Sequence, residues 1–150
     1  MPEPGVARFG IRVRFYELDP YGHVNHATYF QYFEAARVAW LGEAGQGLDL
    51  LQRAGVQLVV TSVATRFVNS ALLDQELEIE TALVQAQRVR AQWAQLAKRG
   101  NELIACQRIN FATVSDTGRP MRMPAGLAEA METIIAPQDW LAKELPDLAL

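Results

Sequence analysis

Residues 12–37, RVRFYELDPYGHVNHATYFQYFEAAR, are the most informative segment of the chain about its fold. Around its start, residues 9–16 alternate between apolar and polar side chains, which predicts a half-buried strand. Pro20 and Gly22 then mark a turn, because both residue types interrupt regular structure. Residues 26–44 follow, rich in alanine and aromatic side chains, and predict a helix. The stretch therefore predicts a strand, a turn and a helix in immediate succession.

The predicted helix has little polar surface. Asn25 stands directly before it and is a favourable N-cap residue. Between positions 27 and 41 the clearly polar residues are Thr28, Gln31, Glu34 and Arg37. A helix with so few polar positions is expected to be buried on most sides. It needs a cover, and a curved sheet wrapped around it supplies one.

The rest of the chain predicts that sheet. Segments with the composition or alternation of strands cover residues 56–69, 76–89, 90–98 and 102–114. Short turns can join several of them as hairpins, which favours antiparallel pairing. Four further elements are expected: a short helix at 47–54, an edge strand at 121–123, a helix that Pro124 opens and that runs to about 135, and a loose helix in the tail at 138–150. The predicted fold class is α+β, a curved antiparallel sheet wrapped around one long buried helix.

Length and composition limit the possible functions. The 150 residues predict a single domain, 1–150, and half of them are apolar. The net charge of −3 gives no support for a nucleic-acid partner. The first residues lack the features of a signal peptide, and no apolar run approaches the roughly 18 residues of a membrane span. We therefore expect a cytoplasmic protein. Cys106 is the one cysteine, which excludes an intramolecular disulfide, and we expect a buried, inert thiol.

The turn before the helix carries the candidate chemistry. Asp19 lies just upstream of the helix N-terminus, where free N–H groups carry partial positive charge. If Asn25 is the cap, the N–H most exposed to a ligand is that of His26. A carboxylate that faces this N–H across a substrate supplies a base or nucleophile together with a polarised carbonyl, which suits acyl transfer to water. In the structural alternative, Asp19 only caps backbone N–H groups of its own loop.

Other kinds of site have weaker support in the sequence. Asp19, His23 and His26 have a D-x3-H-x2-H spacing, and three such ligands could hold a catalytic divalent ion. No further histidine or cysteine lies near them in sequence to act as a fourth ligand. The chain has no G-x-S-x-G motif, no Walker A motif and no dinucleotide-binding glycine pattern. We therefore expect neither a metal site nor a cofactor, and keep a metal-dependent hydrolase as an alternative.

Residues 12–37 resemble the N-terminal signature of hotdog-fold thioesterases. They are similar to the 4-hydroxybenzoyl-CoA thioesterase family, including the acyl-CoA thioesterases associated with the Tol–Pal system. Residues 73–81 resemble the family's entry into its third strand, and a looser match covers about 8–136, leaving 137–150 as a tail. The resemblance implies hydrolysis of a thioester to a free carboxylic acid and CoA. It places the catalytic carboxylate on Asp19 and the carbonyl-polarising N–H at His26, whose side chain is a second candidate.

The resemblance also implies further site residues and an assembly. The expected substrate-binding residues are Gly22, His23, Asn25 and Tyr29, and the expected contacts to CoA phosphates are Arg88, Arg90, Arg119 and Arg122. CoA enters as part of the substrate, so no separate cofactor is expected. Members of the family form homo-oligomers, dimers or tetramers, with active sites at the subunit boundary. For Glu34 and Arg37 the simpler interpretation is packing plus an ion pair on the helix surface.

Two further alternatives remain open at this point. The substrate could be an acyl carrier protein, which the arginine-rich residues 88–99 would attract because carrier proteins are acidic. The domain could also bind acyl thioesters without turnover. Asp19 argues against the second alternative, because a pure binder gains nothing from a carboxylate that faces a thioester.

Overall fold

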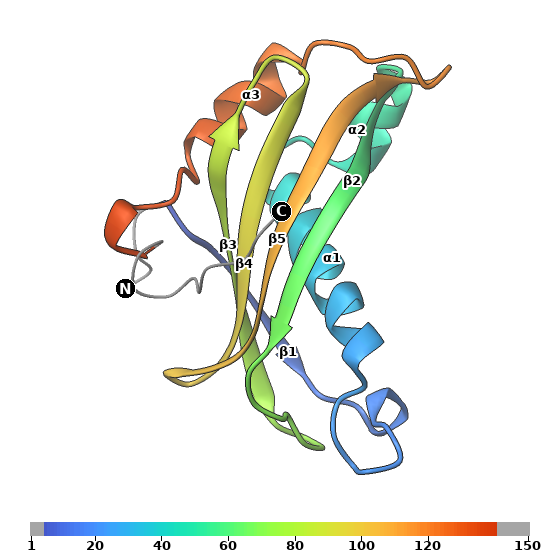
Figure 1. Ribbon diagram of the computed structural model, residues 1–150. Helices are drawn as coiled ribbons and strands as arrows, with labels where there is room; N and C mark the ends of the chain where they lie inside the picture. Colours follow the sequence, from blue (N-terminus) through green and yellow to red (C-terminus); the bar gives the residue numbers. More distant parts are fainter. Residues whose placement is uncertain (1–4, 141–150) are drawn as a thin grey trace.

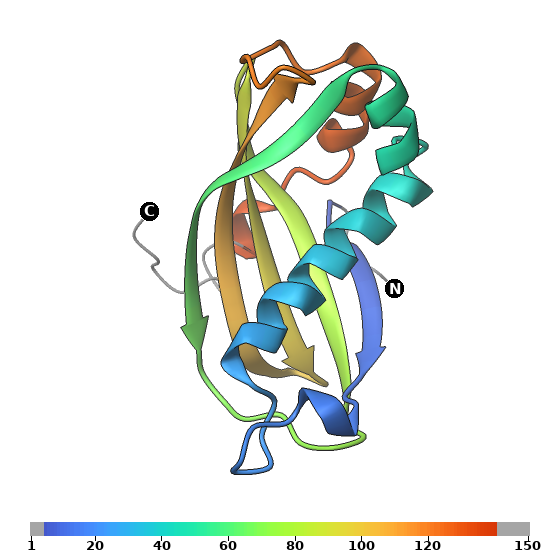
Figure 2. The ribbon, with the colours of Figure 1, turned by 90° about the vertical axis from the view of Figure 1, so that its right-hand side faces the viewer.

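The computed structural model of the chain describes residues 5–140, in which five antiparallel strands form one sheet that curves around a long helix (Figures 1 and 2). In chain order the elements are β1 (Ala7–Arg12), η1 (Phe15–Glu17), α1 (His26–Glu43), α2 (Leu48–Arg53), β2 (Val56–Phe67), β3 (Glu76–Ala86), β4 (Arg90–Arg99), β5 (Glu102–Ser115) and α3 (Ala125–Glu132). The strand order β1-β3-β4-β5-β2 makes β1 and β2 the edges. The predicted fold class, a hotdog fold, is confirmed.

Helix α1 crosses the concave face of the sheet diagonally (Figure 2). It begins where predicted, because the Asn25 side chain accepts a hydrogen bond from Ala27 N–H. Its buried side chains are Tyr29, Tyr32, Phe33, Ala36, Trp40 and Leu41. Near its start these pack with Val13 and Val24, which flank the predicted catalytic loop. The same hydrophobic cluster therefore fixes both the helix and the ends of the loop.

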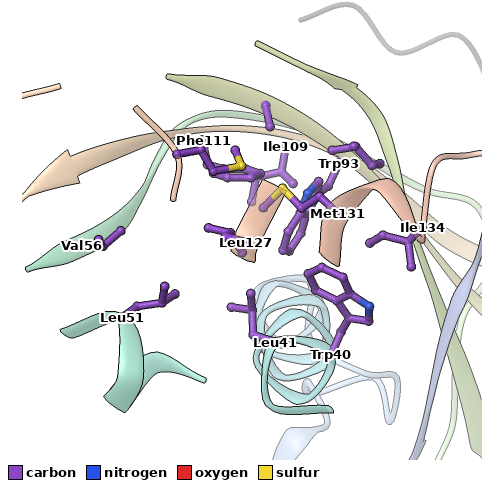
Figure 3. Close-up of a cluster of buried hydrophobic side chains, with 13 residues drawn as sticks. Trp40, Leu41, Leu51, Val56, Trp93, Ile109, Phe111, Leu127, Met131 and Ile134 are labelled. Carbon is purple, nitrogen blue, oxygen red and sulfur yellow. The ribbon is translucent and has the colours of Figure 1, made fainter. Parts of the chain in front are cut away.

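The second half of α1 packs into a larger hydrophobic cluster (Figure 3). Trp93 is central: its ring meets Trp40 edge to face at 5.6 Å and Phe111 at 4.9 Å. Aromatic contacts of this geometry add about 1 kcal/mol each beyond area burial. Leu127 and Met131 of α3 lie in this cluster between side chains of α1 and of the sheet (Figure 3), and α3 covers the end of the sheet that is distant from the predicted catalytic loop (Figure 1).

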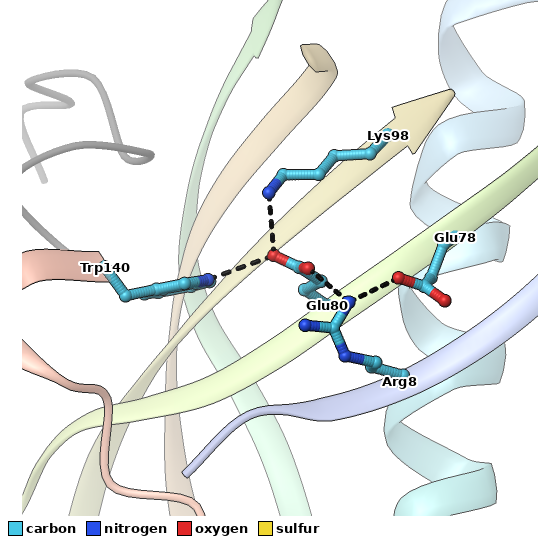
Figure 4. Close-up of polar contacts among 5 residues, drawn as sticks. All are labelled: Arg8, Glu78, Glu80, Lys98 and Trp140. Atoms are coloured by element: carbon cyan, nitrogen blue, oxygen red, sulfur yellow. Dashed lines mark hydrogen bonds and ion pairs between the residues drawn. The ribbon is translucent and has the colours of Figure 1, made fainter. Parts of the chain in front are cut away.

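The outer face of the sheet is partly covered by the segment after α3. Leu83 N–H donates to Ile134 O, and Ala136 N–H donates to Leu83 O, which ties this segment to β3. Trp140 then lies against the outer face, where its indole N–H donates to Glu80 Oε1 at 3.0 Å (Figure 4). Glu80 is buried and also receives Arg8 at 2.7 Å and Lys98 at 3.1 Å. The protein therefore covers with its own chain a surface that would otherwise remain in water.

The first predicted strand is shorter than expected. The alternation over 9–16 predicted that Phe15 points inward, but β1 ends at Arg12 and residues 15–17 form a 3-10 turn. Phe15 is 75% and Tyr16 68% exposed. The reason is Glu17, whose buried carboxylate accepts hydrogen bonds from the chain that precedes it and turns the backbone away from the sheet.

The C-terminal part departs from prediction at 121–123 and in the bounds of α3. Residues 121–123 do not form a strand, although Val114 and Pro120 make an isolated bridge nearby. Pro124 is the N-cap of α3 rather than its first helical residue, and α3 ends at Glu132. The predicted tail helix begins as three helical residues at 138–140, and the rest of it lies outside the described residues. No helix in the described part of the chain is long and apolar enough to cross a membrane.

Candidate active site

The loop that links η1 to α1 closes on itself as a tight reversal. Leu18 and Val24 form an antiparallel bridge, and Asp19 N–H donates to His23 O at 2.7 Å. Gly22 lies between them with φ +80°, a backbone conformation that side-chain-bearing residues rarely adopt. Val24 N–H donates to Ala71 O, so the connection between β2 and β3 supports the loop from outside. Hydrogen bonds within the loop and to the β2–β3 connection therefore hold its conformation.

The two oxygens of the Asp19 carboxylate have different surroundings. Oδ1 accepts hydrogen bonds from Tyr21 N–H at 2.9 Å and from His23 N–H at 3.1 Å. Within residues 5–140, no group donates to Oδ2. The side chain is only half-buried. Asp19 therefore does cap its own loop, as the structural alternative predicted, and still presents one oxygen to a ligand or to water.

The N-terminus of α1 keeps its first N–H available. Asn25 Oδ1 accepts from Ala27 N–H at 2.9 Å, so the capping side chain serves the second residue of the helix and not His26. Asn25 thus has a capping role, and Gly22 shapes the turn. The His26 ring is exposed and lies edge to face with Phe67 at 6.3 Å between centroids. His26, whose N–H carries partial positive charge at the helix N-terminus, therefore has the aromatic ring of Phe67 as a neighbour.

Tyr29, a predicted substrate-binding residue, is buried beside Phe67. It is 3% exposed, and its ring lies 5.6 Å from that of Phe67. Burial raises the pKa of Tyr29; a hydrogen bond with the Ala71 backbone and the Arg99 charge oppose the shift, and the Asp19 charge adds a smaller increase. Its phenol therefore stays neutral at physiological pH.

The two histidine side chains do not join Asp19 in a ligand cluster. His23 Nδ1 lies 3.4 Å from Ser70 Oγ, while the His26 ring faces Phe67. In the described residues, no group of three or more His, Cys, Asp or Glu side chains is arranged to hold a metal ion. The D-x3-H-x2-H spacing thus does not converge, because the loop directs the two rings to different neighbours.

One residue of this region was missed by the sequence analysis. Glu17 is 6% exposed, and its Oε1 accepts from Arg14 N–H at 2.7 Å and from Tyr32 OH at 2.8 Å. Both burial and the Glu17 hydrogen bond raise the pKa of Tyr32. The three-residue spacing from Arg14 to Glu17 is that of a capping box, but the motif begins with Ser or Thr, so the spacing was only a partial local signal for the first contact. The contact with Tyr32 has no such signal.

Arg37 also differs from expectation. The simpler interpretation placed it on the helix surface, paired with Glu34. Instead its Nη1 donates to Gln95 Oε1 at 2.7 Å and lies 3.4 Å from Gln107 Oε1, both on the sheet. Burial lowers the pKa of Arg37 to about 10, and the Glu34 charge only partly offsets this. Arg37 therefore fastens the middle of α1 to β4 and β5.

The four arginines expected at the CoA phosphates belong to segments at the end of the sheet opposite to the loop that carries Asp19 (Figure 2). Arg88 and Arg122 line one pocket of about 470 Å³ beside α3, and Arg90 lines another of about 380 Å³. Arg119 follows β5, next to the start of β2. Figure 2 shows the β3–β4 turn and the segment after β5 at the upper end, and the loop before α1 at the lower end. The structure of one chain therefore does not bring these arginines to Asp19.

Comparison with known proteins identifies the family. Residues 13–131 match the Thioesterase-like superfamily. The chain is 28% identical over 130 residues to the long-chain acyl-CoA thioesterase FadM of Escherichia coli K12, covering 83% of this chain and 96% of FadM. It is 29% identical over 102 residues to the acyl-CoA thioester hydrolase YbgC of Escherichia coli O6:H1, covering 68% and 67%.

A solved structure agrees with these matches. The crystal structure of a hypothetical protein from Thermus thermophilus superposes with a TM-score of 0.80 at 26% identity, covering 85% of this chain and 98% of that one. The narrower 4-hydroxybenzoyl-CoA thioesterase family stays a prediction. The chain belongs to the Thioesterase-like superfamily of hotdog-fold proteins, and the prediction of a thioester hydrolase is confirmed at the level of this family.

Proposed function

We propose that this protein is an acyl-CoA thioesterase that acts in the cytoplasm and hydrolyses its substrate to a carboxylic acid and CoA. One observation carries the assignment to this site: Asp19 has one oxygen held by its loop and the other open, and this loop leads into the helix whose first N–H, that of His26, is not capped by Asn25. The named relatives FadM and YbgC support the substrate class. Asp19 is the base or nucleophile, and His26 N–H polarises the carbonyl.

The chemistry follows from these two groups. The thioester carbonyl oxygen accepts a hydrogen bond from His26 N–H, where the helix dipole stabilises the negative charge that develops on it. Asp19 Oδ2 either takes a proton from the attacking water or attacks the carbonyl carbon itself. In both routes the C–S bond breaks and CoA leaves as a thiolate that gains a proton. In the second route water then hydrolyses the resulting anhydride.

A second copy of the chain completes the site in this proposal. Within residues 5–140, β2 is an edge strand that pairs on one side only, with β5, and edge strands favour pairing with another chain. Its residues on the face toward α1 include Val60, Val63 and Phe67, which are 47%, 40% and 47% exposed. Phe30 on α1 is 45% exposed and extends this apolar surface. Light scattering tests the dimer: Val63→Lys, which places a charge on this surface, should yield monomers.

The dimer also offers a role for one of the arginines. Antiparallel pairing of two β2 strands turns the second copy end for end, so the start of its β2 approaches Phe67 and His26 of the first. Arg119 lies beside the start of β2, because Ser115 pairs with Val56 and accepts a bond from Arg119 N–H. We therefore assign the phosphate contact first to Arg119 of the second copy. Arg88 and Arg122 lie on the β3 side of the sheet, farther from this boundary.

The decisive experiment is an acyl-CoA hydrolysis panel with wild type and Asp19→Asn. Asparagine keeps an oxygen that can accept the two loop hydrogen bonds, so the loop keeps its conformation while the negative charge and the basicity of residue 19 are lost. We expect kcat/KM to fall by about a thousandfold or more. Turnover by Asp19→Asn at the wild-type rate would remove Asp19 from the chemistry. Matched acyl-CoA and acyl-carrier-protein substrates separate those two classes, and tight binding without turnover would instead show a binding module.

A further inference from the structure

Glu17 joins the two halves of the proposed active site through two different groups. Its backbone carbonyl accepts from Asn25 N–H at 2.9 Å, which ties the start of the loop to the cap of α1. Its side-chain carboxylate accepts from Tyr32 OH at 2.8 Å, which ties the same residue to the body of α1. Asp19 follows two residues later. One residue therefore connects the catalytic loop to the helix at two separate points.

Burial makes this connection rigid. Glu17 is 6% and Tyr32 1% exposed, so neither contact is exchanged freely with water. Arg14 balances the negative charge of the Glu17 carboxylate. Its backbone N–H donates to Oε1 at 2.7 Å, and its side-chain Nη1 donates to Oε2 at 3.1 Å. A fully bonded buried polar group specifies one geometry, because any displacement leaves a charge or a hydroxyl without its partner. The arrangement thus holds the loop at one distance from the helix.

Resting on the proposed function, we propose that Glu17 and Tyr32 are positioning residues of the thioester hydrolysis. They set the gap between the Asp19 carboxylate and the His26 N–H, into which the thioester carbonyl must fit. Neither residue touches the substrate. Their importance follows from the steep dependence of rate on geometry, since a displacement of about 1 Å can cost a factor of about 100.

The test compares single-atom changes. Tyr32→Phe removes only the hydroxyl, and Glu17→Gln keeps the shape of the side chain while removing its charge. Tyr16→Phe is the matched control, because it removes a hydroxyl from an exposed tyrosine next to Glu17. The readouts are kcat and KM for a good acyl-CoA, the pH profile of kcat/KM, and the folded fraction by circular dichroism.

We expect kcat of Tyr32→Phe and of Glu17→Gln to fall about 10- to 100-fold, with KM within about twofold of wild type. The double variant should be no slower than the slower single variant, because Tyr32→Phe removes the Tyr32–Glu17 hydrogen bond and Glu17→Gln removes the charge that strengthens it, so both changes act on one connection. Tyr32→Phe keeps every charge, so its pH profile should keep its inflection and lose only height. Tyr16→Phe should match wild type.

Two outcomes overturn this inference. In the first, both variants turn over at the wild-type rate while Asp19→Asn is inactive. In the second, the loss of rate disappears once rates are divided by the folded fraction, which would assign the pair to stability alone. If instead wild type hydrolyses no acyl-CoA, or Asp19→Asn is as fast as wild type, the proposed function fails first, so the two failures are distinguishable.

Discussion

Asp19 and His23 are hydrogen-bonded to each other twice: Asp19 N–H donates to His23 O at 2.7 Å, and His23 N–H donates to Asp19 Oδ1 at 3.1 Å. The same carboxylate oxygen also receives Tyr21 N–H. The loop thus needs an acceptor at position 19, while the proposed chemistry needs a charge there. These two demands can be separated by mutation.

Asp19→Ala should destabilise the protein, whereas Asp19→Asn should not. Alanine leaves two loop N–H groups without their acceptor, which should lower the free energy of unfolding by about 1–2 kcal/mol. Asparagine retains the acceptor and should change it by less than about 0.5 kcal/mol. Urea denaturation of the two variants measures the difference. Equal destabilisation by both would mean that the negative charge, rather than the acceptor oxygen, holds the loop.

Glu80→Gln should destabilise the protein strongly, although Glu80 lies far from the proposed site. Its buried carboxylate is shared by Arg8, Lys98 and Trp140 (Figure 4), and neutralising one member of a buried ionic cluster costs about 3 kcal/mol. Glu76→Gln is the control, because its pair with Arg12 is largely exposed and contributes less than about 0.5 kcal/mol. The measurement is the denaturation midpoint of each variant. Similar midpoints for Glu80→Gln and Glu76→Gln would contradict the prediction.

The stability of the protein should fall in alkali, partly because of Tyr32. Burial and the Glu17 contact raise the pKa of Tyr32 above its ordinary 10.0. Above pH 10 the unfolded chain releases this proton while the folded chain retains it, so the folded state loses stability as pH rises toward the raised pKa. Unfolding free energies between pH 8 and pH 11 should decline less steeply for Tyr32→Phe. The Tyr16→Phe variant should decline as wild type does.

Cys106 should be inert in the folded protein. It is fully buried, and burial raises the pKa of its thiol, so little of the reactive thiolate forms at neutral pH. A chromogenic disulfide reagent should titrate Cys106 only after denaturation, and should leave hydrolysis unchanged before it. Rapid labelling of the native enzyme, or loss of activity in step with labelling, would place the thiol in or beside the site.

Arg119→Ala should weaken binding of the CoA part of the substrate. Loss of one phosphate contact corresponds to about a tenfold rise in KM, with kcat unchanged. A thioester of the same acyl group on N-acetylcysteamine, which has no phosphates, should show no change in KM. Arg12→Ala is a control, since that side chain pairs with Glu76. An equal rise with both substrates would indicate a disturbed acyl pocket.

Local sequence patterns predicted the elements around the site more accurately than their edges. The Asn25 cap and the start of α1 at His26 agree with prediction, because capping depends on residues two positions apart. The end of the first strand was predicted four residues too late, since alternation over 13–16 continued although Glu17 had turned the backbone. The arginines were assigned by resemblance, and their distance from Asp19 depends on which end of the sheet each connecting segment lies at (Figure 2), which no local pattern predicts.

Turns, caps and periodicity are local properties of the chain, and they were enough to predict the order of strand, loop and buried helix, with Asp19 in the loop that leads to the helix N-terminus. The contacts of Glu17 with Tyr32, of Arg37 with Gln95 and of Trp140 with Glu80 on the outer face depend instead on how the whole chain packs. These partners lie 15, 58 and 60 residues apart. No local period spans such separations, so the choice of partner follows from packing the sheet around α1.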